Sequence, residues 1–135
     1  EVLRLKELAT RQRKNGKPLI EDVRFHDRLS RVEVELMALE ITNLRFLDQM
    51  RGGRAPGAEV SLLKIRGTEI QQALTELMVE AVGPFAQPFR SLESTQFDQV
   101  TANIAPRYCN YRKTSIYAGS NEIQRNIMAK ASLGL

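Results

Sequence analysis

The residues best placed to do chemistry lie near the end of the chain, in the run Tyr117-Ala118-Gly119-Ser120-Asn121-Glu122. Gly119 predicts a bend, and the Ser120 hydroxyl is suited to accept a hydrogen bond from an amide at the start of a helix. A helix start attracts anions, because its free N–H groups and the positive end of the helix dipole point towards the ligand. Local chemistry alone leaves two interpretations open: a simple junction between two helices, or a binding site for an anion.

Other kinds of reactive site find little support in the sequence. The chain has one histidine and one cysteine, and no pair of such residues at metal-ligand spacing, so we predict no metal site. Neither standard glycine-rich phosphate loop is present. The pair Glu76 and Glu80 is most simply a solvated helix face, His26 a surface or interface residue, and Cys109 a small packing residue.

Composition narrows the class of protein. The chain has 135 residues, of which 42% are hydrophobic, so it is long enough for one domain with a core and too apolar for a disordered tail. Its net charge of +4 is spread among interspersed acids and bases, which argues against nucleic-acid binding. No apolar run approaches the roughly 18 residues of a membrane span. A single cysteine favours a reducing compartment, so we expect a cytoplasmic protein. A start at Glu1 rather than Met indicates a fragment or a processed product.

The elements that must position the 117–122 run are helices. Strong turn signals fall at residues 15–18, 51–57, 83–88 and at Gly119, and no interval between them alternates like a strand. The predicted helices are Glu1 to about Lys14, about Phe25 to Met50, Ala58 to Val82, Ala105 to Tyr117 and Asn121 to Ser132. Residues 84–97 are expected to be irregular. The predicted fold is all-α: an up-and-down four-helix bundle with an additional C-terminal helix.

The second predicted helix carries two apolar stripes at helical spacing. The first comprises Phe25, Leu29, Val32, Leu36, Leu39, Asn43, Phe46 and Met50. The second comprises Val34, Met37, Ile41 and Leu44. One bundle core cannot easily bury both, and an exposed second stripe would be larger than the apolar patches that monomers usually show. We therefore expect self-association, to a dimer or tetramer, through this helix.

Three motifs resemble one known family. They are Gly16-Lys17-Pro18-Leu19, the run from Leu62 to Glu69, and Tyr111-Arg112-Lys113-Thr114-Ser115-Ile116-Tyr117 followed by Gly119-Ser120-Asn121-Glu122-Ile123-Gln124-Arg125. Together they resemble the C-terminal helical domain of the acyl-CoA dehydrogenase family. The resemblance spans almost the whole chain, so residues 1–135 are expected to be that domain. The family's N-terminal helical and middle β-domains are missing from the sequence.

The resemblance implies an FAD-dependent oxidoreductase of fatty acid metabolism. The family removes hydrogen from the α and β carbons of an acyl-CoA thioester: a carboxylate takes the α-proton and FAD takes the β-hydride. An electron-transfer partner then reoxidises the flavin. Family resemblance also points to a dimer of dimers built from these helical domains. We do not expect the fragment alone to turn over substrate.

Residue roles carried over from the family fall mostly on the 117–122 run. Ser120 and Glu122 stand where the family contacts the nucleotide part of FAD, with Asn121 between them. Tyr117 and Gly119 flank the thioester position. Ala118 stands where many members have the catalytic glutamate. Its main-chain N–H remains available to the thioester carbonyl, but no catalytic base is predicted in this chain.

Arg13 resembles the arginine that reaches the FAD phosphates of a neighbouring subunit. The family usually has this arginine one position earlier, where this chain has Gln12, and Arg11 is a rival for the role. An alternative function from another class stays open. In this alternative, the chain is a non-catalytic helical assembly module, or a non-catalytic subunit of a heteromeric dehydrogenase. The alternative is supported by Ala118, which stands where many family members have the catalytic base.

Overall fold

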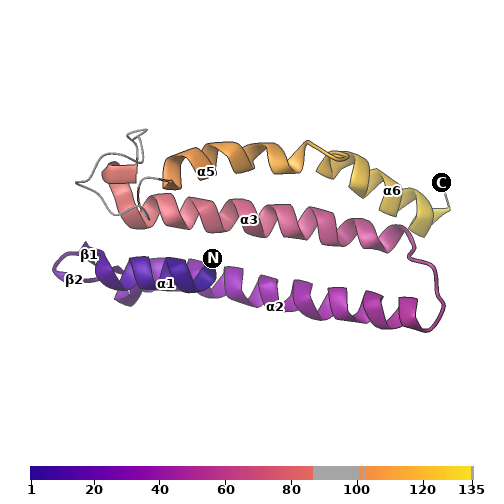
Figure 1. The fold of residues 1–135 in the computed structure, drawn as a ribbon, viewed down its shortest axis with the longest axis horizontal. Helices are drawn as coiled ribbons and strands as arrows, with labels where there is room; N and C mark the ends of the chain where they lie inside the picture. The colour runs from indigo at the N-terminus through magenta and orange to yellow at the C-terminus, as the bar shows by residue number, and fades with distance from the viewer. Residues whose placement is uncertain (87–100, 102, 135) are drawn as a thin grey trace. The chain divides into compact units, whose positions relative to one another are not determined.

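The computed structural model describes residues 1–86, 101 and 103–134, and these are mainly helical (Figure 1). The helices are α1 (Val2–Arg11), α2 (Val23–Arg51), α3 (Ser61–Val82), α5 (Ile104–Tyr111) and α6 (Asn121–Leu133). Four 3-10 helices are η1 (Leu19–Glu21), η2 (Ala58–Val60), η3 (Gly83–Ala86) and η4 (Arg112–Ser115). The all-α class predicted from the sequence is confirmed. The irregular segment expected at 84–97 begins with η3, and residues 87–97 lie outside the described residues.

The chain divides into two compact units. Unit 1 comprises Glu1–Glu33 with Gln71–Arg112, and unit 2 comprises Val34–Ile70 with Lys113–Leu135. The early part of α2 and the late part of α3 therefore belong to unit 1, and the remainder of each helix belongs to unit 2.

Unit 1 contains a small hairpin that the sequence analysis did not predict. The first helix ends at Arg11 rather than near Lys14, and the antiparallel strands β1 (Arg13–Lys14) and β2 (Lys17–Pro18) follow it. Asn15 and Gly16 join the strands with φ of 53° and 80°. An Asn-Gly pair is the residue pair that tolerates two successive left-handed positions in a two-residue hairpin turn. The turn chemistry therefore outweighs the helical pattern that precedes it.

The core of unit 1 holds most of the buried apolar side chains of the described residues. They are Leu5, Leu8, Ala9, Leu19, Phe25, Leu29, Val32, Leu74, Leu77, Met78, Ala81, Val82, Ala86 and Ile104. Asp22 begins α2 by capping it, because its Oδ1 accepts a hydrogen bond from the Phe25 N–H at 3.0 Å. The cap fixes the entry of α2 so that Phe25, three residues on, is fully buried.

The fourth predicted helix starts as expected but ends early. Pro106 lies in the first turn of α5, where a missing N–H costs little. The α-helix ends at Tyr111, not near Tyr117, and continues only as η4. The Gln72 side chain on α3 donates to the carbonyls of Tyr111 and Arg112, both at 3.2 Å, and these carbonyls would otherwise serve a longer α-helix. Cys109 on α5 is exposed, so its predicted packing role is wrong.

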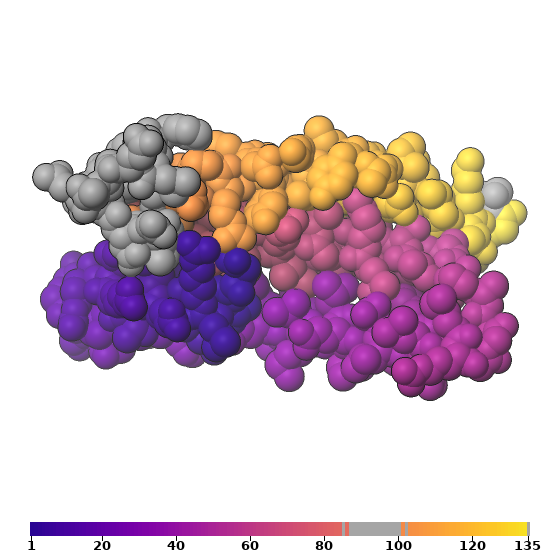
Figure 2. All heavy atoms as spheres, in the orientation of Figure 1, coloured from indigo at the N-terminus to yellow at the C-terminus, as the bar shows by residue number. Residues whose placement is uncertain are grey.

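Unit 2 is built differently. Its part of α3 lies between its part of α2 and α6 (Figure 1), and the space-filling view shows the yellow atoms of α6 seated on α3 (Figure 2). A Cβ added at Gly67 of α3 would lie 3.9 Å from Leu39 Cδ2 of α2, which is ordinary packing distance. Among the described residues of this unit, Ile65 and Ile70 are the only buried apolar side chains.

The two stripes of α2 have different outcomes. In the first stripe, Phe25, Leu29 and Val32 are buried, whereas Leu36, Leu39 and Phe46 are only half-buried, and Asn43 and Met50 are exposed. The second stripe is uncovered within this chain: Val34, Met37, Ile41 and Leu44 are 58–65% exposed. Other large apolar residues that unit 2 exposes are Leu47, Met50, Ile116, Tyr117, Ile123, Ile127 and Leu133.

Candidate functional site

The site predicted at the end of the chain forms the start of α6. Ser120 is its N-cap, with φ −60° and ψ 159°, and its Oγ accepts a hydrogen bond from the Ile123 N–H at 3.3 Å. The helix ends at Gly134, which adopts the left-handed conformation with φ 69°. The predicted cap and the predicted stop are both confirmed, and together they set the residues at which α6 begins and ends.

The turn before α6 has an unusual backbone. Ala118 has φ 53° and Gly119 has φ 82°, so two successive residues are left-handed. For a non-glycine residue this conformation costs roughly 1–2 kcal/mol. An added Cβ at Gly119 would lie 2.5 Å from Gln124 Nε2, the end of a flexible side chain that can move away, so the positive φ is the main reason for glycine at this position. Strain of this kind persists where surrounding contacts hold it, often at functional sites.

The residues of this turn face solvent within this chain. Tyr117 is 53% exposed, and Ala118 and Gly119 are exposed as well. The N–H groups of Ile116 and Tyr117 both donate to the Lys113 carbonyl, at 3.0 and 3.1 Å. No backbone hydrogen bond within the described parts of the chain uses the Ala118 N–H. The predicted thioester contact is therefore open to a ligand.

Asn121, unlike its neighbours, points into unit 2. It is 5% exposed, and its Oδ1 accepts hydrogen bonds from Lys64 Nζ at 2.8 Å and from Thr68 Oγ1 at 3.2 Å. Its Nδ2 lies 3.1 Å from Thr68 Oγ1. Asn121 was predicted to touch the nucleotide. The structure shows its amide engaged with α3, and the nucleotide contact stays a prediction.

Glu122 is exposed and lies in the first turn of α6. The main-chain N–H of Glu122 and the Ser120 hydroxyl donate to its carboxylate and lower its pKa. This side chain therefore stays ionised at neutral pH and already occupies the positive end of the helix. A carboxylate there accepts hydrogen bonds from sugar hydroxyls and repels phosphates. The start of α6 is therefore better suited to hydroxyl groups than to phosphates, which need cations from elsewhere.

Arg13, the predicted phosphate contact, lies on β1 of unit 1 and is exposed. Its guanidinium forms no ion pair with the residues that the structure describes. The rival Arg11 ends α1, is also exposed, and has interactions within the chain. Arg13 and the α6 start belong to different units.

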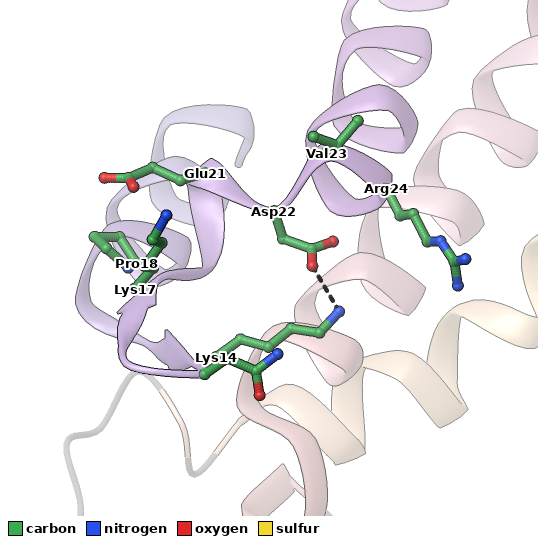
Figure 3. Close-up of a pocket in the computed structure, with 8 residues that line it drawn as sticks. Lys14, Lys17, Pro18, Glu21, Asp22, Val23 and Arg24 are labelled. Carbon is green, nitrogen blue, oxygen red and sulfur yellow. Dashed lines mark ion pairs between the residues drawn. The ribbon is translucent and has the colours of Figure 1, made fainter.

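A hollow of about 410 Å³ lies beside the hairpin in unit 1, as Figure 3 shows. Lys14 and Asp22 point towards each other there, and Lys14 Nζ lies 2.8 Å from Asp22 Oδ2. The Lys14 ammonium, together with the Phe25 N–H, lowers the pKa of Asp22. Lys17, Arg24 and Glu21 also line the hollow, so three positive side chains lie against two negative ones. Because Asp22 already neutralises Lys14 and Glu21 offsets a second cation, the net positive charge left for an anion is small.

Sequence reasoning missed the partners of Asn121. Lys64 and Thr68 are four residues apart on α3, so they lie on the same face of that helix. Two polar residues at this spacing in a largely apolar helix indicate that a buried polar partner lies opposite them. Asn121 lies 57 residues after Lys64 and 53 residues after Thr68.

Two kinds of feature are absent from the described residues. No group of three or more His, Cys, Asp or Glu residues is arranged to hold a metal ion in the described parts of the chain. None of the described helices combines the length and the apolar character that a membrane crossing requires.

Comparison with known proteins gives one family. The family model described as acyl-CoA dehydrogenase, C-terminal domain, matches residues 2–133. A search of curated proteins finds no significant match.

Among solved structures, the glutaryl-coenzyme A dehydrogenase glutaryl-CoA complex matches with a TM-score of 0.78 and 18% identity, over 98% of this chain and 31% of that chain. Butyryl-CoA dehydrogenase from Megasphaera elsdenii matches with a TM-score of 0.75 and 17% identity, over 98% of this chain and 32% of that chain. The ChsE4-ChsE5 complex from Mycobacterium tuberculosis matches with a TM-score of 0.74 and 26% identity, over 99% of this chain and 34% of that chain.

At these identities the first two matches establish the fold alone, and the chain spans about a third of the length of the chains it matches. The family rests on the sequence model, which covers nearly every residue and includes both the α6 start and the hairpin. The fold and the family model agree with the motifs at both ends of the chain. The chain therefore belongs to the acyl-CoA dehydrogenase family and has the all-α fold of its C-terminal domain.

Proposed function

We propose that this chain is the part of an FAD-dependent acyl-CoA dehydrogenase that contacts the flavin nucleotide and the acyl thioester. The observation that carries the proposal is the left-handed pair Ala118–Gly119, which leads directly into the capped start of α6. Ala118 adopts a costly conformation although its methyl group can do no acid–base chemistry. The proposal explains that conformation by the main-chain N–H, which hydrogen-bonds the thioester carbonyl.

The other residues of the site take complementary parts. Glu122 accepts hydrogen bonds from sugar hydroxyls of the nucleotide, and Ser120 holds both Glu122 and the helix start. Tyr117 and Gly119 flank the thioester. Bound FAD supplies the acceptor for the β-hydride. The α-proton needs a carboxylate from outside this chain, because Ala118 has none to offer.

The experiment that tests the proposed function uses the full-length protein to which this chain belongs. We expect the purified protein to be yellow, and the flavin absorbance to bleach when an acyl-CoA is added without an electron acceptor. Acyl-CoAs of several chain lengths serve as probes, and free coenzyme A is the control that offers no acyl group. A yellow protein that no acyl-CoA bleaches would contradict the dehydrogenase function.

Arg13 is proposed to bind the FAD phosphates of a neighbouring subunit. Replacing Arg13 by alanine is expected to weaken FAD binding by about 1.5–3 kcal/mol, the usual worth of a hydrogen bond to a charged group, or about ten- to hundredfold in Kd. Lysine should rescue only part of this loss, because it lacks the two-pronged geometry that suits phosphate. FAD content after dialysis of the full-length protein is the measurement.

Arg11→Ala is the matched control, because Arg11 is an exposed arginine two residues away. Its FAD content should stay close to that of the unmodified protein. The opposite pattern, loss with Arg11→Ala and none with Arg13→Ala, would transfer the phosphate contact to Arg11.

Self-association is the second part of the proposal. Unit 2 has two buried apolar side chains among its described residues, Ile65 and Ile70, yet it exposes most of the large apolar residues that the structure leaves uncovered. A three-helix unit with so small a core gains little by burial within itself. We propose that a second copy, or a related subunit, covers the second stripe of α2.

A second candidate function rests on Ala118. Its methyl group cannot act as a base, so the chain could equally be a non-catalytic subunit of a heteromeric dehydrogenase. One of the similar solved structures is a complex of two different chains, ChsE4 and ChsE5, which agrees with such an arrangement. A colourless full-length protein that turns yellow or active only with a second dehydrogenase subunit would favour this candidate. Fatty acid metabolism, an electron-transfer partner and a cytoplasmic location belong to the proposal in either form.

A further inference from the structure

One lysine joins both ends of the turn that carries Ala118. Lys64, half-buried on α3, donates from its ammonium to Asn121 Oδ1 at 2.8 Å and to the Ser115 carbonyl at 3.3 Å. Ser115 is the last residue of η4, and Asn121 is the first residue of α6. The five residues between them, 116–120, include the left-handed pair. A single charged group therefore bridges the segment on which the proposed thioester contact depends.

Thr68 completes the arrangement one helical turn further along α3. Its hydroxyl lies within hydrogen-bond distance of the Ile65 carbonyl, at 2.9 Å, and of both polar atoms of the Asn121 amide. The amide of Asn121 is buried and held through both its oxygen and its nitrogen, so it cannot rotate freely. This fixes the orientation of the first residue of α6 relative to α3.

The turn itself has little to hold it. Ile116, Tyr117, Ala118 and Gly119 are all exposed, and the left-handed pair makes no backbone hydrogen bond within the described parts of the chain. Apolar packing on an exposed turn cannot hold a strained backbone. Apart from the bonds of Ile116 and Tyr117 to the Lys113 carbonyl, the fixed ends at Ser115 and Asn121 impose the conformation, because a short segment with both ends fixed has few alternatives.

We infer that Lys64 is a positioning residue, which clamps Ser115 to Asn121 and thereby keeps the Ala118 N–H turned towards the thioester carbonyl. The identity of the ligand rests on the proposed function. The clamp itself is a property of α3 and the turn and can be tested without any ligand. Packing alone would not need an ammonium here, whereas the ammonium of Lys64 donates to an oxygen at each end of the turn.

The first test replaces Lys64 by methionine, which keeps the length of the side chain and removes its charge and donors. Hydrogen exchange of the full-length protein, followed by mass spectrometry, reads the hydrogen-bonded amides on either side of the left-handed pair, which are those of Ile116, Tyr117, Ile123 and Gln124. These amides should exchange about tenfold faster or more, since charged hydrogen bonds to both ends of the turn are lost. Peptides from residues 74–82, in the core of unit 1, should be unchanged. Lys64→Arg, which keeps a charged donor, should restore most of the protection.

Lys130→Met is the matched control, because Lys130 is exposed on α6 and has no side-chain partner in the described residues. It should leave exchange in the turn unaltered. Thr68→Val serves as a second variant if Lys64→Met folds poorly, and should speed exchange of the turn to a smaller degree. A well-folded Lys64→Met or Thr68→Val protein with normal exchange at the amides of Ile116, Tyr117, Ile123 and Gln124 would overturn the clamp.

A ligand measurement separates positioning from a purely structural role. In the flavin-loaded protein, Lys64→Met should weaken the binding of an acyl-CoA, read from the shift of the flavin absorbance, about tenfold with FAD content unchanged. Faster exchange with unaltered acyl-CoA affinity would show that Lys64 stabilises the turn without positioning the N–H. If the unmodified protein bound no acyl-CoA at all, the proposed function would fail, while the exchange experiment would still decide the clamp.

Discussion

Replacing Phe25 by alanine is expected to lower the free energy of unfolding by about 3–5 kcal/mol, the usual cost of removing a buried phenylalanine. Phe25 has no exposed surface and is the largest fully buried side chain of the described residues. Its loss leaves a cavity in the core of unit 1, where the described apolar burial is concentrated. Such a loss is a large share of the 5–15 kcal/mol that stabilises a typical domain.

Val23→Ala is the control for this substitution. Val23 lies two residues earlier in the first turn of α2 and is 82% exposed, so its replacement should change stability by no more than about 0.5 kcal/mol. Urea unfolding followed by far-ultraviolet circular dichroism measures both variants. A loss below about 1 kcal/mol for Phe25→Ala would mean that the core of unit 1 does not depend on this side chain.

The parts of the fold that the sequence predicts well are those with local causes. The start and end of α6 depend on Ser120 and Gly134, whose roles as cap and left-handed stop follow from their own chemistry. The start of α5 near Pro106 follows from the fixed backbone of proline. The Asn15-Gly16 signal was equally local. The pair predicts a turn, and the structure shows that this turn closes a hairpin.

The errors have causes distant in the sequence. The end of α5 at Tyr111 depends on hydrogen bonds from Gln72, which lies 39 residues earlier. Likewise, no local pattern could show which stripe of α2 faces inward along its whole length. Both stripes are apolar, and the small core of unit 2 leaves even the first stripe half-buried at Leu39 and Phe46.

The candidate site shows the same division. Ala118 was identified from the motif around it, but only the structure gives its positive φ, because alanine itself has no preference for that conformation. The inward direction of Asn121 is also a tertiary property, set by Lys64 and Thr68. The motif therefore identifies the segment, whereas contacts with α3 decide which way a side chain such as that of Asn121 points.

Replacing Ile41 by lysine is expected to break the assembly of the full-length protein, with Kd for self-association rising at least about a hundredfold. Ile41 is 59% exposed and lies within the second stripe of α2. If a partner covers this stripe, the new charge is buried without a counter-ion, and an uncompensated buried charge costs about 3–5 kcal/mol. Sedimentation velocity over a range of concentrations measures the change.

Asn43→Lys adds the same charge two residues further along α2, on a different side of the helix because successive residues turn by about 100°. Asn43 is already polar and exposed, so this control should assemble normally. An Ile41→Lys protein that assembles as well as the control would place the interface elsewhere.

The assembly result also bears on the flavin. Arg13 is proposed to reach the FAD of a neighbouring subunit, so a protein that no longer assembles should lose FAD even though its own Arg13 is intact. Ile41→Lys and Arg13→Ala should then show similar FAD loss on dialysis, while sedimentation distinguishes them, because only Ile41→Lys dissociates. Full retention of FAD by a dissociated Ile41→Lys protein would show that each subunit holds its flavin alone, and the contact between subunits at Arg13 would be excluded.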